Sequence, residues 1–184
     1  MLLSACQNFK KTQLILFESL SFGMPEKSFQ EVFGEASEVV EETEMAYRDA
    51  WRAEDPYFYK TGRLFYDYEN ITLNGYTGRA RFTFSKSHRL EKATVHIPVA
   101  SKGEQYVVLN NLSQTIKKEI EALPNFQSVT TETVGLYDNG YRYKVKLKGQ
   151  RKELRVDVYP TEDEDAKEIE DKKYTIRVDQ FRMY

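Results

Sequence analysis

The sequence predicts an α+β fold in which an antiparallel sheet carries helices on one face. Three observations predict this class: short segments in which apolar and polar residues alternate, Asn-Gly pairs between such segments, and two segments with the apolar spacing of a helix. The 184 residues are enough for one domain that buries roughly 70% of the surface of the unfolded chain. A hydrophobic share of 40%, with 13 tyrosines and 11 phenylalanines, is typical of a globular core.

The N-terminal part of the chain is predicted to contain a short helix. Residues 12–17 are apolar and form either a first strand or an anchor for the N-terminus. Further along, Pro25 suits the first turn of a helix, acidic residues follow it, and Gly34 suits its end. The apolar residues expected on one face of this helix are Phe29, Val32 and Phe33. Acids dominate residues 35–44, and the mixed aromatic and charged residues 45–59 are predicted to form a loop or a short helix.

Strand patterns follow, interrupted by one long helix. The expected strands are residues 63–73, 78–84, 92–97, 129–136, 141–148, 153–159 and 174–183. Asn74-Gly75 and Asn139-Gly140 are pairs that two-residue hairpin turns prefer. From Tyr106 to Leu123 apolar residues recur at spacings of three and four, and Pro124 follows, which predicts a helix that ends there. The polar, acidic residues 161–173 are predicted to connect two strands.

The two halves of the chain can be overlaid. Three features of the first half recur in the same order in the second half. The run Asn74-Gly75-Tyr76 matches Asn139-Gly140-Tyr141, and the strand that starts at Arg79 matches the strand that starts at Arg142. The segment from Val95 to Pro98 matches the segment from Val156 to Pro160. Because a helix precedes each set, the overlay predicts a duplication. The resulting divisions are residues 1–22 as a signal and tether, 23–100 as the first helix-plus-strand repeat and 101–184 as the second. Chance similarity is the alternative, since turn chemistry alone favours Asn-Gly and alternation.

The chain has one cysteine, Cys6, which ends the run Leu3-Ser4-Ala5-Cys6. This run resembles the lipobox of bacterial lipoproteins, in which an apolar residue and two small residues precede a cysteine that is lipidated. The resemblance implies a lipid anchor at Cys6 and a place in the bacterial cell envelope, on a membrane and facing outside the cytoplasm. Only Met1 to Ala5 precede Cys6, so the pattern fits a signal peptide whose front is missing. The alternative is an ordinary free thiol near the terminus.

A second resemblance begins at Phe22-Gly23-Met24 and continues through Phe29, Val32 and Phe33-Gly34-Glu35-Ala36. These residues are similar to the opening of the small lipoprotein domain of the outer-membrane barrel-assembly machinery, and to the repeats of β-lactamase inhibitory protein. Pro25 stands where Ser or Thr is usual in those families, and Ala36 or Ser37 where Pro is usual. The resemblance implies an antiparallel sheet after the helix and a non-enzymatic binding or assembly role. It assigns no functional residue.

Strand alternation predicts which side chains a partner would meet. The core face is expected to carry Phe82, Phe84, Val95, Ile97, Tyr143, Val145, Leu147, Leu154, Val156, Val158, Ile176 and Val178. The opposite face is expected to carry Arg81, Lys92, His96, Arg142, Lys144, Lys146, Lys148, Arg155 and Arg177. Because the net charge is −2, the acids are expected elsewhere, and such a cationic face would attract an anionic partner. The alternative is a solvated face whose lysines discourage association of sheet edges.

An aromatic segment is the other candidate surface. Its residues Trp51, Tyr57 and Tyr59, with Tyr47 before them and Tyr66 and Tyr68 beyond, suit a binding patch because they bury much area and keep a polar tip in water. Core filling explains most of them equally well.

The sequence contains no catalytic signature and implies no cofactor or metal. His88 and His96 are the only histidines, and no third ligand is indicated. The expected function is a non-catalytic envelope lipoprotein that binds a protein or an anionic polymer, with nucleic acid not the expected partner. One alternative is a soluble cytoplasmic domain with a regulatory binding role, in which Cys6 is incidental. Another is a hydrolase whose site assembles from scattered residues.

Overall fold

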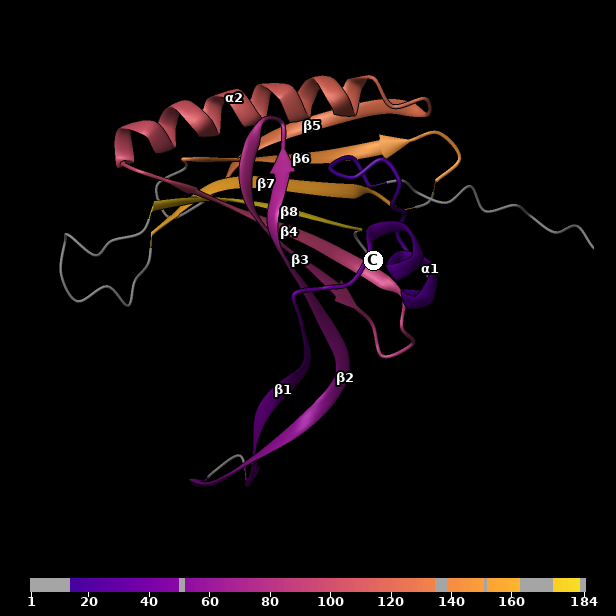
Figure 1. Ribbon diagram of the computed structural model, residues 1–184, viewed down its shortest axis with the longest axis vertical. Helices are drawn as coiled ribbons and strands as arrows, with labels where there is room; N and C mark the ends of the chain where they lie inside the picture. The colour runs from indigo at the N-terminus through magenta and orange to yellow at the C-terminus, as the bar shows by residue number, and fades with distance from the viewer. Residues whose placement is uncertain (1–13, 50–51, 135–138, 151, 163–173, 183–184) are drawn as a thin grey trace, which may run out of the picture.

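The computed structural model describes residues 14–49, 52–134, 139–150, 152–162 and 174–182, with the backbone alone described for 45–49, 52–58 and 162 (Figure 1). Within these residues the fold is α+β: eight antiparallel strands form one open sheet, and one long helix packs on one face. The helices are α1 (Glu26–Phe33) and α2 (Lys102–Glu121). The strands are β1 (Glu38–Asp49), β2 (Arg52–Leu73), β3 (Tyr76–Phe84), β4 (Leu90–Val99), β5 (Phe126–Val134), β6 (Gly140–Leu147), β7 (Leu154–Glu162) and β8 (Tyr174–Arg182). The antiparallel sheet predicted from the sequence is confirmed.

The strands lie side by side in the order β1-β2-β3-β4-β8-β7-β6-β5. Each helix is followed in the chain by four strands that pair with their sequence neighbours. The last strands of the two sets, β4 and β8, pair with each other in the middle of the sheet, where Val95 lies opposite Val178. The edges of the described sheet are therefore β1 and β5.

The face of the sheet that carries the helices is apolar, as strand alternation predicts. α2 contacts β4 to β8 and buries Leu109, Leu112 and Ile116 against them. The predicted core residues that are buried are Phe82, Phe84, Val95, Ile97, Tyr143, Val145, Leu154, Val156, Val158, Ile176 and Val178. Leu147 is half-buried at the margin of this core. Packing of these side chains beneath the two helices orients the whole sheet, because it forces the alternate polar residues to the other face.

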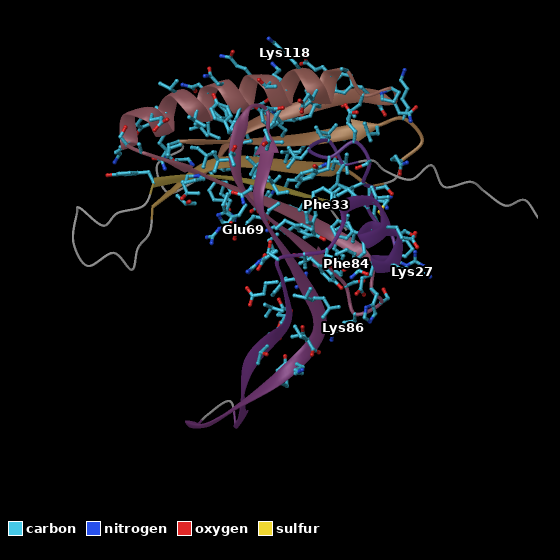
Figure 2. The ribbon with its side chains drawn as sticks, viewed as in Figure 1. Lys27, Phe33, Glu69, Phe84, Lys86 and Lys118 are labelled. Carbon is cyan, nitrogen blue, oxygen red and sulfur yellow. The ribbon has the colours of Figure 1, made fainter. Side chains whose placement is uncertain are left out.

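α1 covers β2 and β3 on the same face (Figure 2). The ring of Phe29 is fully buried, with its centroid 4.9 Å from that of Phe82 and 5.1 Å from that of Phe84. Phe33, one turn later, also packs on Phe82 at 4.9 Å. The expectation that Val32 shares this face is wrong: its side chain is 52% exposed, because Phe29 and Phe33 form the contact row and Val32 lies beside it.

α2 begins at a capped N-terminus. The hydroxyl of Ser101 accepts a hydrogen bond from the backbone N–H of Glu104, whose carboxylate accepts one from the backbone N–H of Ala100. The expectation that Tyr106 faces the core is wrong, since Tyr106 is exposed and the preceding residue Gln105 is buried. The Gln105 amide donates to the carbonyl oxygens of Thr161 and Thr175, each at 3.0 Å, so a polar side chain occupies the place where α2 crosses the ends of β7 and β8.

The described residues of the predicted N-terminal segment, 14–17, serve as an anchor and not as a strand. Leu14, Ile15 and Leu16 are buried in irregular backbone, and the Leu16 N–H donates to the buried side-chain oxygen of Gln180 in β8. The described part of the chain is therefore held to the core from its first residue onward.

Residues 45–59, which the sequence predicts to form a loop or a short helix, instead belong to strands β1 and β2, apart from residues 50–51, which lie outside the described residues. β1 pairs with β2 from Glu38 opposite Asp67 to Asp49 opposite Arg52, and this β1–β2 hairpin extends away from the rest of the sheet (Figure 1). Its acids find partners across the hairpin: Glu41 pairs with Lys60 at 2.7 Å. Because such partners lie on the neighbouring strand, the sequence of β1 taken alone shows only a run of acids.

The two Asn-Gly pairs have different roles. Asn74 and Gly75 both have positive φ, 51° and 84°, and form the two-residue turn between β2 and β3 that the sequence predicts. The predicted turn at Asn139-Gly140 is wrong, because Gly140 already belongs to β6 and pairs with Val134. A Cβ at Gly140 would lie 2.6 Å from the Cβ of Tyr159, so a glycine is needed there for the close approach of β6 and β7.

The sequence overlay of the two halves is displaced by one strand. It equates Arg79 in β3, the third strand after α1, with Arg142 in β6, the second strand after α2. The element order, in contrast, places β3 in the same position as β7. The overlay aligned the two Asn-Gly pairs with each other, but only Asn74-Gly75 forms a two-residue turn. This difference displaces the alignment by one strand.

Candidate functional site

The second face of the sheet, which we call the open face, carries no helix among the described residues. Cross-strand register aligns one polar row over all eight strands. In sheet order this row is Glu38, Asp67, Arg81, Thr94, Asp179, Asp157, Arg142 and Glu132. Rows of cations and aromatic rings lie on either side of it, for example Arg79, His96, Arg177 and Tyr159 on one side.

Asp179 lies near the centre of this row and is 5% exposed. It accepts hydrogen bonds from the hydroxyls of Thr94 at 2.7 Å and Tyr159 at 3.0 Å. Lys92 at 3.1 Å and Arg177 at 3.2 Å form ion pairs with it. Burial alone would raise the pKa of Asp179, but these hydrogen bonds and charges outweigh burial and hold the pKa below its usual value.

Asp157 lies directly opposite Asp179 on β7 and is equally buried. Two guanidinium groups cover it: Arg155 approaches to 2.5 Å and Arg142 to 3.0 Å. Burial acts to raise the pKa of Asp157, and the hydrogen bonds from Arg155 and Arg142 overcome that effect and lower it. The two like charges can face each other because each has its own pair of cations.

The predicted cations that belong to strands lie on the open face, but the expectation that acids lie elsewhere is wrong. Seven of them form ion pairs: Arg81 with Asp67 (2.7 Å), Lys92 with Asp179 (3.1 Å), Arg142 with Asp157 (3.0 Å), Lys144 with Glu132 (2.6 Å), Lys146 with Glu153 (3.4 Å), Arg155 with Asp157 (2.5 Å) and Arg177 with Asp179 (3.2 Å). Lys148 follows the end of β6 and is exposed. The open face is therefore a mosaic of both charges and not a uniformly cationic surface.

Sequence reasoning missed the carboxylates that carry this arrangement. Asp157 stands between Val156 and Val158, and Asp179 follows Val178. The same alternation that placed the arginines on the open face places these aspartates there. The strand pattern therefore indicates these aspartates, but the many acids in other segments favoured the prediction that the acids lie away from the open face.

A hollow of about 740 Å³ lies on the open face where β1 and β2 meet β3, β4 and β8. Its acidic residues are Glu38, Glu42, Asp67 and Glu69, all from β1 and β2. Its basic residues on the other strands are Arg79, Arg81, Lys92, His96 and Arg177. The acids of the hollow thus lie on its β1 and β2 side, where Arg63 pairs with Glu42, and its other cations lie on the floor.

His96 lies in the floor of the hollow, half-buried between two arginines. Cross-strand register places Arg79 on one side of it and Arg177 on the other. Burial, with the positive charges of Arg177 and Arg79, lowers the pKa of His96 to about 4. Burial is the largest cause of this shift and the two arginines add to it, so the imidazole is neutral at neutral pH.

Aromatic rings of the open face act mainly as supports for arginines. The Arg81 guanidinium lies 5.2 Å from the ring centroid of Phe65, and that of Arg155 lies 4.8 Å from the ring of Phe181. Of the predicted aromatic patch, Tyr59 is 40% exposed and donates to Glu44, whereas Tyr66 and Tyr68 are buried in the core. Trp51 lies outside the described residues, as do the side chain of Tyr57 and the predicted lipidation site Cys6.

A second polar cluster fixes α1 to the sheet. Glu26 accepts a hydrogen bond from the Tyr66 hydroxyl and pairs with Nδ1 of His88 at 2.5 Å. These contacts join the first turn of α1 to β2 and to the β3–β4 turn. Within the part of the chain that the structure describes, no set of three or more His, Cys, Asp or Glu side chains is placed to hold a metal ion. Of the described helices, none has the length and apolar character of a transmembrane segment.

Comparison with known proteins gives no relative from which a role could be taken: no protein-family model, curated protein or solved structure matches the chain. We therefore infer a function from the chemistry and shape of the open face.

Proposed function

We propose that this protein is a non-catalytic binding module of the bacterial cell envelope, attached to a membrane through Cys6, that binds a protein partner on its open face. The hollow between the β1–β2 hairpin and the centre of the sheet carries this proposal. A concave polar surface that is flanked by a projecting hairpin gives a partner contacts from two directions. The α2 helix, on the other face, is occupied with the core and leaves the open face as the accessible side.

The charge mosaic favours a protein over an anionic polymer. A polyanion would meet Asp67 and Glu132 as well as the arginines, and like charges at an interface disfavour binding. A folded partner can present both signs of charge in a matching pattern, which gives specificity. The ordered ion pairs also fix the long side chains before a partner arrives, so less side-chain entropy is lost on binding.

We also propose that the two sets of one helix and four strands arose by duplication. The support is the element order, in which each helix precedes four sequentially paired strands, and the central pairing of the last strand of each set. An exposed face that is shared by two such units would be twice as wide as that of one unit, which suits a macromolecular partner.

Site-directed photo-crosslinking tests the binding face. We expect a photoreactive phenylalanine analogue at Phe65 or Phe181, both on the open face, to give a crosslinked species of defined mass in the native host. The same analogue at Lys118, on the side of α2 turned away from the sheet (Figure 2), is the matched control and should give none. If protease treatment removes the crosslinked species, the partner is a protein. Equal crosslinking from Lys118, or a crosslinked species that resists protease, would contradict the proposal.

Metabolic labelling with an alkyne analogue of palmitate tests the anchor. The wild-type protein should be labelled and should sediment with membranes, since two or more acyl chains hold a protein on a bilayer. Cys6→Ser should lose both properties, and Ser4→Ala, which keeps a small residue at that place, should retain them. An unlabelled wild-type protein in the soluble fraction would favour the cytoplasmic alternative.

A further inference from the structure

We propose that the floor of the hollow is a carboxylate-binding site, in which Arg79 and Arg177 hold an acidic side chain of the partner above His96. This inference deepens the proposed function and rests on it, because it names the group that the open face recognises.

Strand register brings the three residues together. Arg79 of β3 lies opposite His96 of β4, which lies opposite Arg177 of β8. All three line the hollow. Neighbouring strands are about 4.8 Å apart, so the two arginines start about 10 Å from each other, one on each side of the histidine. Two guanidinium groups at this spacing can both donate to one carboxylate that lies between them.

The donors of these two arginines are available, whereas the other cations of the hollow are engaged. Arg79 is exposed and forms no ion pair or hydrogen bond with the described residues. Arg177 donates from Nε to Asp179, and its two Nη groups have no hydrogen-bond partner in the described part of the chain. Arg81, in contrast, is held by both oxygens of Asp67 at 2.7 Å. Guanidinium donors without a hydrogen-bond partner among the described residues therefore lie on either side of His96.

The charges that surround His96 support the same site. Arg79 and Arg81 on β3 and Arg177 on β8 make the local potential positive, and Asp179 on β8 only partly opposes them. An anion at this point would relieve the repulsion among these groups. The acids of the opposite wall, Glu38 and Glu69, disfavour a doubly charged phosphate more than a singly charged carboxylate. An acidic residue of a protein is therefore the anion that fits.

Nuclear magnetic resonance of the His96 ring tests the inference with the whole protein. We expect an acetyl-capped tri-glutamate peptide to raise the pKa of His96 from its value of about 4, because a bound carboxylate stabilises the imidazolium. Arg79→Gln should weaken the peptide about tenfold or more, the loss expected for a charged hydrogen bond. Lys86→Gln removes the same charge from the β3–β4 turn, outside the hollow, and should leave the affinity within about twofold.

The remaining outcomes separate this inference from the proposed function. Equal losses in the Arg79 and Lys86 variants, or an unchanged pKa of His96 at saturating peptide, would overturn the carboxylate site. Inorganic phosphate that shifts His96 as strongly as the peptide at equal concentration would also overturn it. If Arg79→Gln keeps its affinity for the peptide while the crosslink from Phe65 persists, the carboxylate site is refuted but the open face remains the binding face. If the wild-type protein gives no crosslink from Phe65, the proposed function itself fails.

Discussion

Replacement of Phe29 with alanine is expected to lower the free energy of unfolding by about 3–5 kcal/mol, the usual cost of removing a buried phenylalanine ring. Phe29 is the one fully buried residue of the eight-residue helix α1, and it contacts rings from three elements. Its neighbours at ring-centroid distances of 4.9 to 6.1 Å are Phe33, Tyr66, Tyr68, Phe82 and Phe84. The cavity left by alanine would remove all of these contacts at once, and so short a helix has little stability of its own.

Val32→Ala is the matched control on the same helix. The Val32 side chain is 52% exposed, so its truncation should change the free energy of unfolding by no more than about 0.5 kcal/mol. Urea unfolding followed by tyrosine fluorescence measures both variants. A loss below about 1 kcal/mol for Phe29→Ala would show that α1 is not held to the sheet as described.

Asp179→Asn is expected to cost about 2 kcal/mol at neutral pH, because it leaves the cations of Lys92 and Arg177 without their carboxylate. The cost stays below that of a fully buried ion pair, since the side chains of Lys92 and Arg177 remain 29% and 33% exposed. Relief of the repulsion between Asp179 and Asp157, which face each other across the strands, offsets part of the loss.

The effect of this substitution should depend on pH. Folding lowers the pKa of Asp179, so its stabilisation is complete above the ordinary aspartate pKa of about 3.9 and is lost as the pH falls through the lower folded value. The difference between wild type and Asp179→Asn should therefore shrink steadily as the pH is lowered below about 4. Urea unfolding at a series of pH values measures this difference. A constant difference over that range would mean that the carboxylate charge contributes nothing.

Glu153→Gln supplies the control for this experiment. Glu153 pairs with Lys146 at 3.4 Å on the same face, but Lys146 is 59% exposed. Such a pair contributes no more than about 1 kcal/mol, and its removal should leave the acid sensitivity of the protein nearly unchanged. Equal effects of the two substitutions would argue against a special role for the central aspartates.

The sequence predicted most strands and both helices because their signals are local. Alternation over Tyr143 and Val145, or the Asn74-Gly75 turn, needs no knowledge of a partner strand. β1 was missed for the opposite reason, since Glu41 is stabilised by Lys60 on the other strand of the hairpin. Gln105 was missed because a buried amide that binds two strand carbonyls breaks the apolar spacing on which helix prediction depends.

The sequence predicts on which face of the sheet the residues of the candidate site lie, but it does not predict which residues pair with one another. Alternation placed Arg142 and Arg155 on the face away from the helices, where the structure has them. Their shared partner Asp157 could be assigned only with the register between β6 and β7, which one sequence does not supply. The hollow could not be predicted either, because one of its walls is β1, which the sequence did not predict as a strand.

The place of β8 in the sheet also governs how the chain is made. β8 is the last described strand to leave the ribosome, yet it lies between β4 and β7, pairing Lys92 with Phe181 and Leu154 with Arg182. Until it is synthesised, both neighbouring strands present unpaired backbone, which is the kind of surface that promotes aggregation of nascent chains. Pairing of β4 with a strand so distant in sequence also slows folding. The sheet can therefore close only after β8 has been synthesised. A chain that terminates before β8 would leave β4 and β7 unpaired in the middle of the sheet.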